Sequence, residues 1–234
     1  MIDIHCHLLY GVDDGAETME EAAAMLKEAA KQGIDAIILT PHWRHGLFPY
    51  PKDTIEAHYE IVRKYARELG IAVYLGTEYH VDSQMMENFS KGSCHPLADT
   101  RYILTEYSHS TRPEMARQMT AEAVRYGYIP VIAHAERYGF VMEDPEILEE
   151  LRDMGALIQI NADAVLGLDG RGTKKLCKWI LKAGLADFIA SDSHGVDKRP
   201  CNLKRCYDYV AKKYGGETAQ RLFYDNPAQI LAER

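Results

Sequence analysis

Hydrophobic and polar residues alternate along the chain with two different periods. Seven runs are continuously apolar or apolar at every second position, as in short strands, and apolar residues recur every three to four positions between them, as in amphipathic helices. The predicted strands are IDIHC at the N-terminus, IDAIILT, IAVYLGTEYH, RYILTEYSH, IPVIAHAER, ALIQIN and ADFIASDSH. A continuous apolar run such as IDAIILT predicts a strand buried on both faces.

Helix signals separate these strands. In MEEAAAMLKEAAKQ, Thr18 and Glu21 resemble a capping box and Gly33 ends the helix. Further helices are predicted from about Asp53 to Leu69, Ser83 to Phe89, Pro113 to Tyr126 and Asp144 to Met154, over TKKLCKWILKAG, from Leu203 to Tyr214 and Glu217 to Phe223, and over NPAQILAE. Repeated strand–helix units predict parallel strands with right-handed crossovers, closed into a barrel or spread as an open sheet. Both arrangements place chemistry at the carboxyl ends of the strands.

Length and charge narrow the class of protein. With 234 residues, 47% hydrophobic and 26% charged, we expect a globular protein forming one large domain over residues 1–234, although two small domains would also fit this length. The net charge of −8, without any basic block, disfavours nucleic acid and anionic membranes as main partners. No apolar run approaches the ~20 residues of a membrane span, and Asp3 and His5 interrupt any signal-peptide core, so we expect a cytoplasmic protein.

Cysteine and glycine patterns exclude several kinds of site. The five Cys include no Cys-x-x-Cys pair, so neither a disulfide framework nor a zinc ribbon is indicated. No Cys is followed six positions later by Arg, so the phosphate-binding loop of thiol-dependent tyrosine phosphatases is absent. No Gly-x-Gly-x-x-Gly or P-loop follows a strand, which leaves the usual modes of nucleotide binding unsupported.

Histidine and carboxylate residues gather where the predicted strands end. One such His is more often structural than a ligand, but His, Asp and Glu at six separate strand ends favour a metal site. These residues are His5, His7, Asp14, His42, Glu78, Glu106, His134, Asp192 and His194. His5 and His7 alternate with Cys6, so their rings are expected to share a face from which Cys6 points away. Nine ligands exceed the needs of one ion, and two or three Mn, Fe or Zn ions would suit this mixture of His and carboxylates. Such clusters generate hydroxide near neutral pH and bind phosphoryl oxygens, so phosphoester hydrolysis is the first expectation.

At this point the motifs resemble a known family. DIHCH, PHW, the Glu after the third strand, AHAER and SDSH are similar to the motifs of the polymerase-and-histidinol-phosphatase (PHP) metal-dependent phosphoesterases. Within that family, VDDG, GTEYH, the Glu106 segment, AHAERY and SDSHGVDKRP are closest to bacterial manganese-dependent tyrosine-protein phosphatases encoded with capsule and exopolysaccharide genes. The resemblance runs from Met1 to about Pro200. It implies a distorted seven-stranded (β/α)7 barrel, similar to a TIM barrel, with a trinuclear site occupied most often by Mn.

The same resemblance implies a role for each candidate residue. His5, His7, Glu78 and Asp192 would hold one metal, Glu78 would bridge to a second with Glu106 and His134, and Asp14, His42 and His194 would hold the third. Arg137 and Arg199 would bind the substrate phosphate, for which the guanidinium fork is well suited. Tyr10 and Ala135 depart from the usual motifs without removing a ligand, and they bear on loop shape and substrate choice.

Three classes of function follow. The resemblance favours a protein-tyrosine phosphatase that uses metal-bound hydroxide, with the phosphotyrosine tail of a bacterial tyrosine kinase controlling polysaccharide export as its substrate. The alternative is a small-molecule phosphoesterase such as histidinol-phosphate phosphatase, and chain length and Asp14 favour the former. A regulatory domain without activity is disfavoured by the intact ligand set. Trp43, Phe48 and Tyr50 could form an aromatic wall for the phosphotyrosyl ring or could simply pack a long loop. The sequence does not specify an oligomeric state and is compatible with a homo-oligomer.

Overall fold

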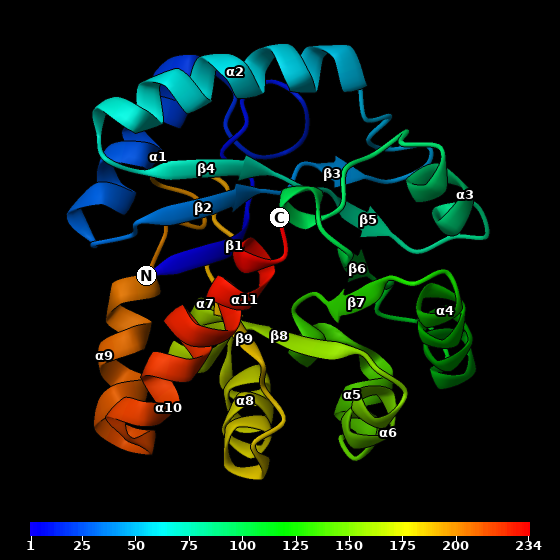
Figure 1. Cartoon of the computed structure of the whole chain (residues 1–234). Helices are drawn as coiled ribbons and strands as arrows, with labels where there is room; N and C mark the ends of the chain where they lie inside the picture. The colour runs from blue at the N-terminus through cyan, green and yellow to red at the C-terminus, as the bar shows by residue number, and fades with distance from the viewer.

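The computed structural model describes residues 1–234, and strands and helices alternate along them (Figure 1). The strands are β1 (Ile2–Cys6), β2 (Ala36–Leu39), β3 (His42–Trp43), β4 (Ala72–Leu75), β5 (Glu78–His80), β6 (Tyr102–Glu106), β7 (Ile129–Ile132), β8 (Leu157–Asn161) and β9 (Phe188–Ala190). All seven predicted runs contain a strand. The number differs from the prediction because the third run divides into β4 and β5, and because the short strand β3 forms just after the second run, which contains β2.

Both divisions have a local cause. Thr40 and Pro41 separate β2 from β3, and Pro has no N–H to donate to a neighbouring strand. Gly76 and Thr77 separate β4 from β5. A Cβ added to Gly76 would lie 2.8 Å from Leu97 Cδ2 and 3.1 Å from Ile38 Cγ2, so the chain approaches the interior too closely for any larger residue.

The strands form two sheets, and every pair of neighbours within them is parallel. One sheet has the order β1-β2-β4 and the other has the order β3-β5-β6-β7-β8-β9. The chain after β9 returns to the first strand: Asp192 N donates to His5 O (2.9 Å), and His7 N donates to Ser193 O (2.9 Å). The α/β class with parallel strands is therefore confirmed, and the carboxyl ends of β1 and β9 lie side by side.

Helices surround these strands (Figure 1). They are α1 (Met19–Lys31), α2 (Lys52–Glu68), α3 (Met85–Ser90), α4 (Pro113–Arg125), α5 (Gly139–Glu143), α6 (Ile147–Asp153), α7 (Ala162–Leu166), α8 (Arg171–Ala183), α9 (Leu203–Tyr214), α10 (Gly216–Gln220) and α11 (Asn226–Ala232), with 3₁₀ turns η1 (Leu97–Asp99) and η2 (Ala135–Arg137) and a π-helical turn η3 (Arg221–Asp225). At the start of α1, Thr18 Oγ1 accepts a hydrogen bond from Glu21 N (3.2 Å), but the Glu21 side chain accepts one from Glu17 N instead of Thr18 N. Half of the predicted capping box therefore forms. None of these helices has the length and apolar character that crossing a membrane requires.

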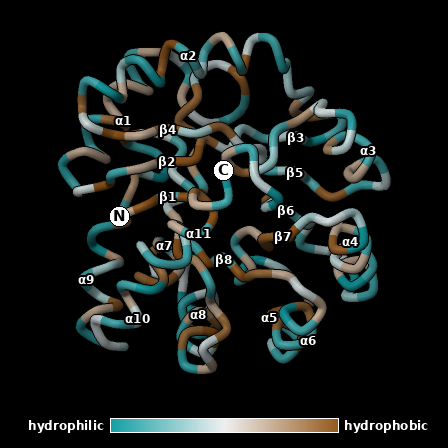
Figure 2. The backbone as a smooth tube through the Cα atoms, in the orientation of Figure 1, coloured by the Kyte–Doolittle hydropathy of each residue, from teal (hydrophilic) through white to brown (hydrophobic).

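Two apolar clusters hold the layers together. The inner cluster contains Ile4, Ile38, Leu104, Val131 and Phe188 from five different strands, and Ile230 of α11 and Leu97 of η1 join it. Because η1 directly precedes β6, η1 and α11 cover the amino ends of the strands. The larger outer cluster packs the helices against the strands, which appear as apolar segments beneath more polar helices in Figure 2. Apolar packing therefore fills the interior up to the carboxyl ends, where the polar candidates begin.

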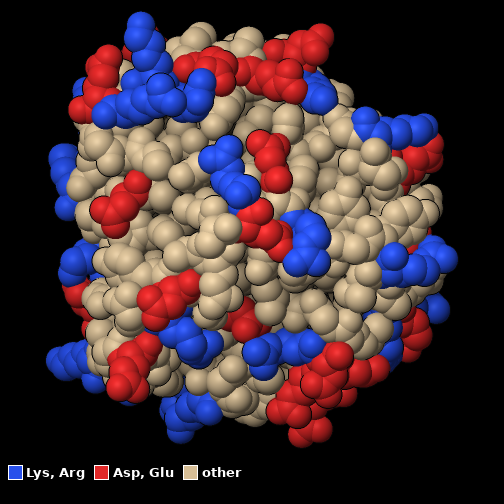
Figure 3. Space-filling model, in the orientation of Figure 1, with Lys and Arg blue, Asp and Glu red and all other residues tan.

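Charged side chains are mixed over the surface. On the face shown in Figure 3, Lys and Arg are interspersed with Asp and Glu over most of the surface, acidic side chains gather at the lower right edge, and no extended basic block is present. This distribution agrees with the absence of a basic block in the sequence.

Candidate metal centre

A bulge in β1 directs both of the first two histidines inward. The pairing of β1 with β2 shifts by one residue between Asp3 and Cys6. In a regular strand Ile4 and His5 would face opposite sides, yet Ile4 packs in the inner cluster and the His5 ring also turns toward the interior. His5 Nε2 and His7 Nε2 lie 3.1 Å apart, while Cys6 packs in the outer cluster. The predicted convergence of the two rings and the opposite placement of Cys6 are both found.

The first group of candidates surrounds these two rings. His5 Nε2 lies 3.1 Å from Glu78 Oε2 and 3.4 Å from Asp192 Oδ1. His7 Nε2 lies 3.1 Å and 3.6 Å from the same two oxygens. All four side chains are buried. Four residues from three distant parts of the sequence thus present their ligand atoms to one point.

The second group shares Glu78 with the first. His134 Nε2 is 2.8 Å from Glu78 Oε1 and 3.9 Å from Glu106 Oε1. Glu78 therefore points one carboxylate oxygen at each group, which is the geometry of a bridging ligand. His42 also joins this set, because His42, Glu78 and Glu106 each offer a ligand atom within 4.8 Å of the others.

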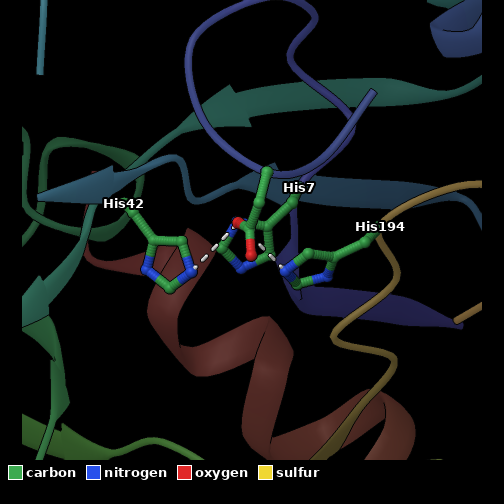
Figure 4. A group of neighbouring side chains, drawn as sticks. His7, His42 and His194 are labelled. Atoms are coloured by element: carbon green, nitrogen blue, oxygen red, sulfur yellow. Dashed lines mark ion pairs between the residues drawn. The ribbon is translucent and has the colours of Figure 1, made fainter. Parts of the chain in front are cut away.

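The third group is built around Asp14. Its Oδ1 lies 3.4 Å from His42 Nε2 and 3.5 Å from His194 Nε2, and the rings of His7, His42 and His194 converge in Figure 4. The ligand atoms of these three His and Asp14 all lie within 4.8 Å of one another. The structure brings all nine predicted residues together. It places His7 with the third group as well as the first, and His42 with the second as well as the third, so the groups overlap more than the resemblance implied.

Three site residues adopt backbone conformations that side-chain-bearing residues rarely adopt. His134 (φ 31°), Asp192 (φ 51°) and Arg199 (φ 52°) are all left-handed. Such conformations cost free energy of order 1–3 kcal/mol each and persist where the surrounding structure enforces them. Here His134 and Asp192 turn the chain sharply just after β7 and β9, which directs their side chains into the cluster.

Hydrogen bonds orient the candidate ligands, and several of the partners were missed from the sequence. Asp13 Oδ2 accepts from His42 N (2.9 Å) and lies 2.8 Å from His7 Nδ1, which leaves Nε2 of His7 facing the cluster. Gln159 Oε1 lies 3.1 Å from His5 Nδ1 and accepts from His134 N (2.8 Å). Gln159 Nε2 donates to Asn161 Oδ1 (2.8 Å), and Asn161 Nδ2 donates to Asp192 Oδ2 (2.7 Å).

Hydrogen-bonding side chains also orient Glu106. His80 Nδ1 lies 3.1 Å from Glu106 Oε2, and Ser108 Oγ lies 3.1 Å from His80 Nε2. Glu106 Oε1 is left to face His134. His80, to which the sequence assigned no role, thus fixes the orientation of a candidate ligand.

Arg137 and Arg199 meet at one carboxylate oxygen. Arg137 Nη1 donates to Asp192 Oδ2 (2.8 Å), and Arg199 Nη2 donates to the same oxygen. Arg137 Nη2 also lies 3.4 Å from Asp169 Oδ2. The two Arg side chains remain 33% and 40% exposed, so part of each guanidinium stays open to solvent beside the cluster.

Charges within the cluster determine which protonation states are favoured. Burial raises the pKa of Glu78, but the charges of His5 and His42 and the hydrogen bond from His134 outweigh it and hold the pKa well below its ordinary value. The pKa of Asp192 is lowered in the same way: burial opposes the shift, and His5, Arg199 and Arg137 cause it. Both carboxylates are therefore ionised at neutral pH, as ligation of a cation requires.

The histidines divide into two kinds. Burial lowers the pKa of His42 and of His194, and neighbouring His7 lowers both further, so their neutral rings are favoured. Burial also opposes the charged forms of His7 and His134, but Asp13 and Glu78 raise the pKa of His7 and Glu78 raises that of His134. A cation that binds at these two residues must displace a proton.

The donor set fits divalent transition-metal ions. Glu78 Oε2, His42 Nδ1 and His194 Nε2 are buried, point into the cluster and lack a hydrogen-bond partner. Buried polar atoms normally find such partners, and cations bound in these groups would satisfy the three atoms. Five His and four carboxylates match the preference of Mn, Fe and Zn rather than that of Ca or Mg.

The three aromatic residues near His42, namely Trp43, Phe48 and Tyr50, have different environments in the structure. Tyr50 is buried, and its hydroxyl accepts a hydrogen bond from Thr77 Oγ1 (2.8 Å). Trp43 stacks on buried Tyr79, with ring centroids 5.5 Å apart. These two rings belong to the core, so only Phe48 of the three candidates lies against the cluster. Tyr10 stacks on His58 (4.0 Å between centroids) and shapes the neighbouring loop.

Comparison with known proteins extends over the whole chain. The protein family described as "Capsular polysaccharide synthesis, CpsB/CapC" matches residues 1–232. The chain is 35% identical over 241 aligned residues to the tyrosine-protein phosphatase CpsB of Streptococcus pneumoniae, covering 100% of this chain and 99% of that protein. It is 34% identical to the tyrosine-protein phosphatase YwqE of Bacillus subtilis over 93% of this chain and 86% of that protein.

A solved structure agrees with these relatives. It comes from crystallographic work on YwqE from Bacillus subtilis and CpsB from Streptococcus pneumoniae, described as unique metal-dependent tyrosine phosphatases. The two chains superpose with a TM-score of 0.93 at 31% sequence identity, covering 100% of this chain and 95% of the other. The similarity therefore includes the segments that carry every candidate ligand.

Proposed function

The chain belongs to the CpsB/CapC family of capsular polysaccharide synthesis, and from this membership we propose that it is a metal-dependent tyrosine-protein phosphatase. The observation that carries the proposal is the convergence of nine His, Asp and Glu residues into overlapping groups at one end of the strands. The names of the relatives favour a protein phosphatase over the alternative of a histidinol-phosphate phosphatase.

Each group would hold one ion. His5, His7, Glu78 and Asp192 would hold the first, Glu78 with Glu106 and His134 the second, and Asp14, His42 and His194 the third. His7 and His42 each lie beside two groups, so the three candidate positions are adjacent. We propose two to three divalent ions, with Mn as the resident metal and Fe or Zn as alternatives. Bound there, the ions would supply hydroxide near neutral pH and polarise a phosphoryl oxygen.

The residues of the chain would then orient the substrate. Asp192 directs Oδ1 toward His5 and His7, while its Oδ2 holds Arg137, Arg199 and Asn161. Anchored in this way, both guanidinium groups keep further N–H donors free for the oxygens of a phosphate. Bidentate donation from two Arg would counter the charge that spreads over these oxygens during phosphoryl transfer.

Residues 1–234 would act as a single domain in the form of a distorted (β/α)7 barrel, with the divided second and third strands accounting for the distortion. We propose a cytoplasmic enzyme whose substrate is a phosphotyrosine protein, namely the tail of a bacterial tyrosine kinase that regulates capsule or exopolysaccharide synthesis. A homo-oligomer is compatible with this role.

A comparison of substrates tests the proposed function. Metal-free protein would be refilled separately with Mn, Fe or Zn, and hydrolysis of a phosphotyrosine peptide, the matching phosphoserine peptide and histidinol phosphate would be compared. We expect the highest kcat/KM on the phosphotyrosine peptide with Mn. Preferential hydrolysis of histidinol phosphate would instead support the small-molecule alternative, and no hydrolysis with any metal would contradict both.

A further inference from the structure

A short hairpin holds Phe48 in a fixed position beside the cluster. Arg44 N donates to Phe48 O (3.0 Å), and Phe48 N donates to Arg44 O (2.8 Å). Gly46, at the tip, is left-handed with a φ of 77°, which glycine adopts without strain. The hairpin directly follows β3, so the position of Phe48 is tied to that of His42 at the start of the same strand.

The Phe48 ring lies flat against a candidate metal ligand. Its centroid is 5.0 Å from that of His42, and the two planes differ by only 7°. His42 itself is buried, whereas Phe48 is only partly buried. Part of the Phe48 ring therefore stays accessible at the edge of the cluster. Trp43 cannot supply this surface, because successive side chains of a strand point to opposite faces and its ring packs on Tyr79.

We propose that Phe48 is the aromatic platform that contacts the ring of a phosphotyrosine substrate and so favours aryl over alkyl phosphates. This inference rests on the proposed function. A phosphate bound by the cluster and by the two arginines carries its tyrosyl ring on the ester oxygen, so the ring must lie beside the cluster. Stacked or edge-to-face contact between aromatic rings adds affinity that a phosphoserine side chain cannot obtain.

Phe48 also has a simpler role to be distinguished from this one. By covering His42, its ring could only shield that residue from solvent and fix its orientation. Loss of such a shield would weaken metal binding and would affect all phosphate ligands equally. A platform for the substrate ring would instead affect ligands according to whether they carry a ring.

Two phosphonates that cannot be hydrolysed separate the two roles. Phenylphosphonate and methylphosphonate share the same anionic head group, and only the former has a ring. Calorimetry would measure their Kd on Mn-loaded wild type, Phe48→Ala and Phe48→Tyr, with metal content verified by elemental analysis. Leu47→Ala serves as the matched control, because Leu47 is the adjacent residue on the hairpin and is 58% exposed.

We expect Phe48→Ala to raise the Kd of phenylphosphonate roughly three- to tenfold and to leave that of methylphosphonate unchanged. Phe48→Tyr should restore phenylphosphonate binding, and Leu47→Ala should bind both ligands as wild type does. An equal loss for both ligands in Phe48→Ala, or no loss for either, would overturn the platform. Failure of the wild type to hydrolyse a phosphotyrosine peptide would instead count against the proposed function. The two failures are distinguishable, because the phosphonate Kd values test the role of Phe48 without requiring turnover.

Discussion

Glu136, which follows His134 by two residues, offers a quantitative test of the buried polar layer behind the cluster. Its side chain is fully buried; Oε1 accepts a hydrogen bond from Asn161 N (3.2 Å), and Oε2 has no partner. Burial raises the pKa of Glu136 from 4.5 to about 7, although the nearby positive charges of Arg137 and His134 oppose the shift. The folded protein therefore holds a proton on Glu136 at pH values where the unfolded chain has released it.

The sign of the resulting pH dependence follows from linkage. Because the folded state binds more protons than the unfolded state between pH 4.5 and about 7, Glu136 destabilises the fold progressively as the pH rises through this range. At pH 8, ionisation of Glu136 costs about 3 kcal/mol, whereas at pH 5 the cost is below about 1 kcal/mol. Glu136→Gln removes the titration and retains the shape.

The assay is urea denaturation of metal-free wild type and Glu136→Gln at pH 5 and pH 8. In Glu136→Gln, the buried amide group without a hydrogen-bond partner also costs free energy, but this cost is the same at pH 5 and pH 8 because an amide does not titrate. We therefore expect the free energy of unfolding of the variant, relative to wild type, to increase by about 2 to 3 kcal/mol between pH 5 and pH 8. Glu143→Gln, at an exposed position in α5, should show no such change. An identical pH dependence in wild type and Glu136→Gln would refute the reasoning.

Three further predictions concern the site. Arg199→Lys keeps the charge but loses the guanidinium fork, so kcat/KM on a phosphotyrosine peptide should fall on the order of tenfold, about 1.4 kcal/mol, with unchanged metal content; wild-type kinetics would argue against phosphate binding by Arg199. Asp13→Asn should weaken metal affinity or activity roughly 10- to 100-fold, because Asp13 orients His7 and the backbone of His42, and a competition titration with a chromogenic chelator would measure the affinity. Since carboxylates raise the pKa of His7 and His134, acidification should increase proton competition, and the same titration should show metal affinity falling from pH ~8 to pH ~6; a flat profile would contradict this competition.

The ligand-type residues could be predicted because parallel strands place their carboxyl ends together. His42, Glu78 and Asp192 are separated by long stretches of sequence, yet each follows an apolar run that predicts a strand. Residue type and position after the strand were therefore sufficient to predict that these side chains converge. Their partition into groups was less predictable, because His42 has two ring nitrogens that face different groups, and this depends on the rotation of its ring.

The residues that orient the ligands carry a weaker signal. Gln159 and Asn161 lie in the apolar run of β8, where an amide side chain near the end of a strand is an ordinary feature of the sequence. The site residues that they bond, His5, His134 and Asp192, come from other parts of the chain. Asp13 and Asp14 are adjacent and chemically alike, but only the three-dimensional path of the loop decides which one holds His7 and which one faces the cluster. The five-residue helix α7 was missed because ADAVL is too short to show a helical period.

Parallel measurement of metal content and turnover tests the central claim most directly. Wild type and Asp192→Ala would be treated with a chelator and refilled with Mn, elemental analysis would give the number of ions bound per chain, and hydrolysis of a phosphotyrosine peptide would be followed on the same samples. Removal of the metal should abolish turnover in wild type and refilling should restore it, while Asp192→Ala should remain folded, bind fewer ions and lose turnover by orders of magnitude. Full activity in a wild-type sample shown to be free of metal would contradict the account.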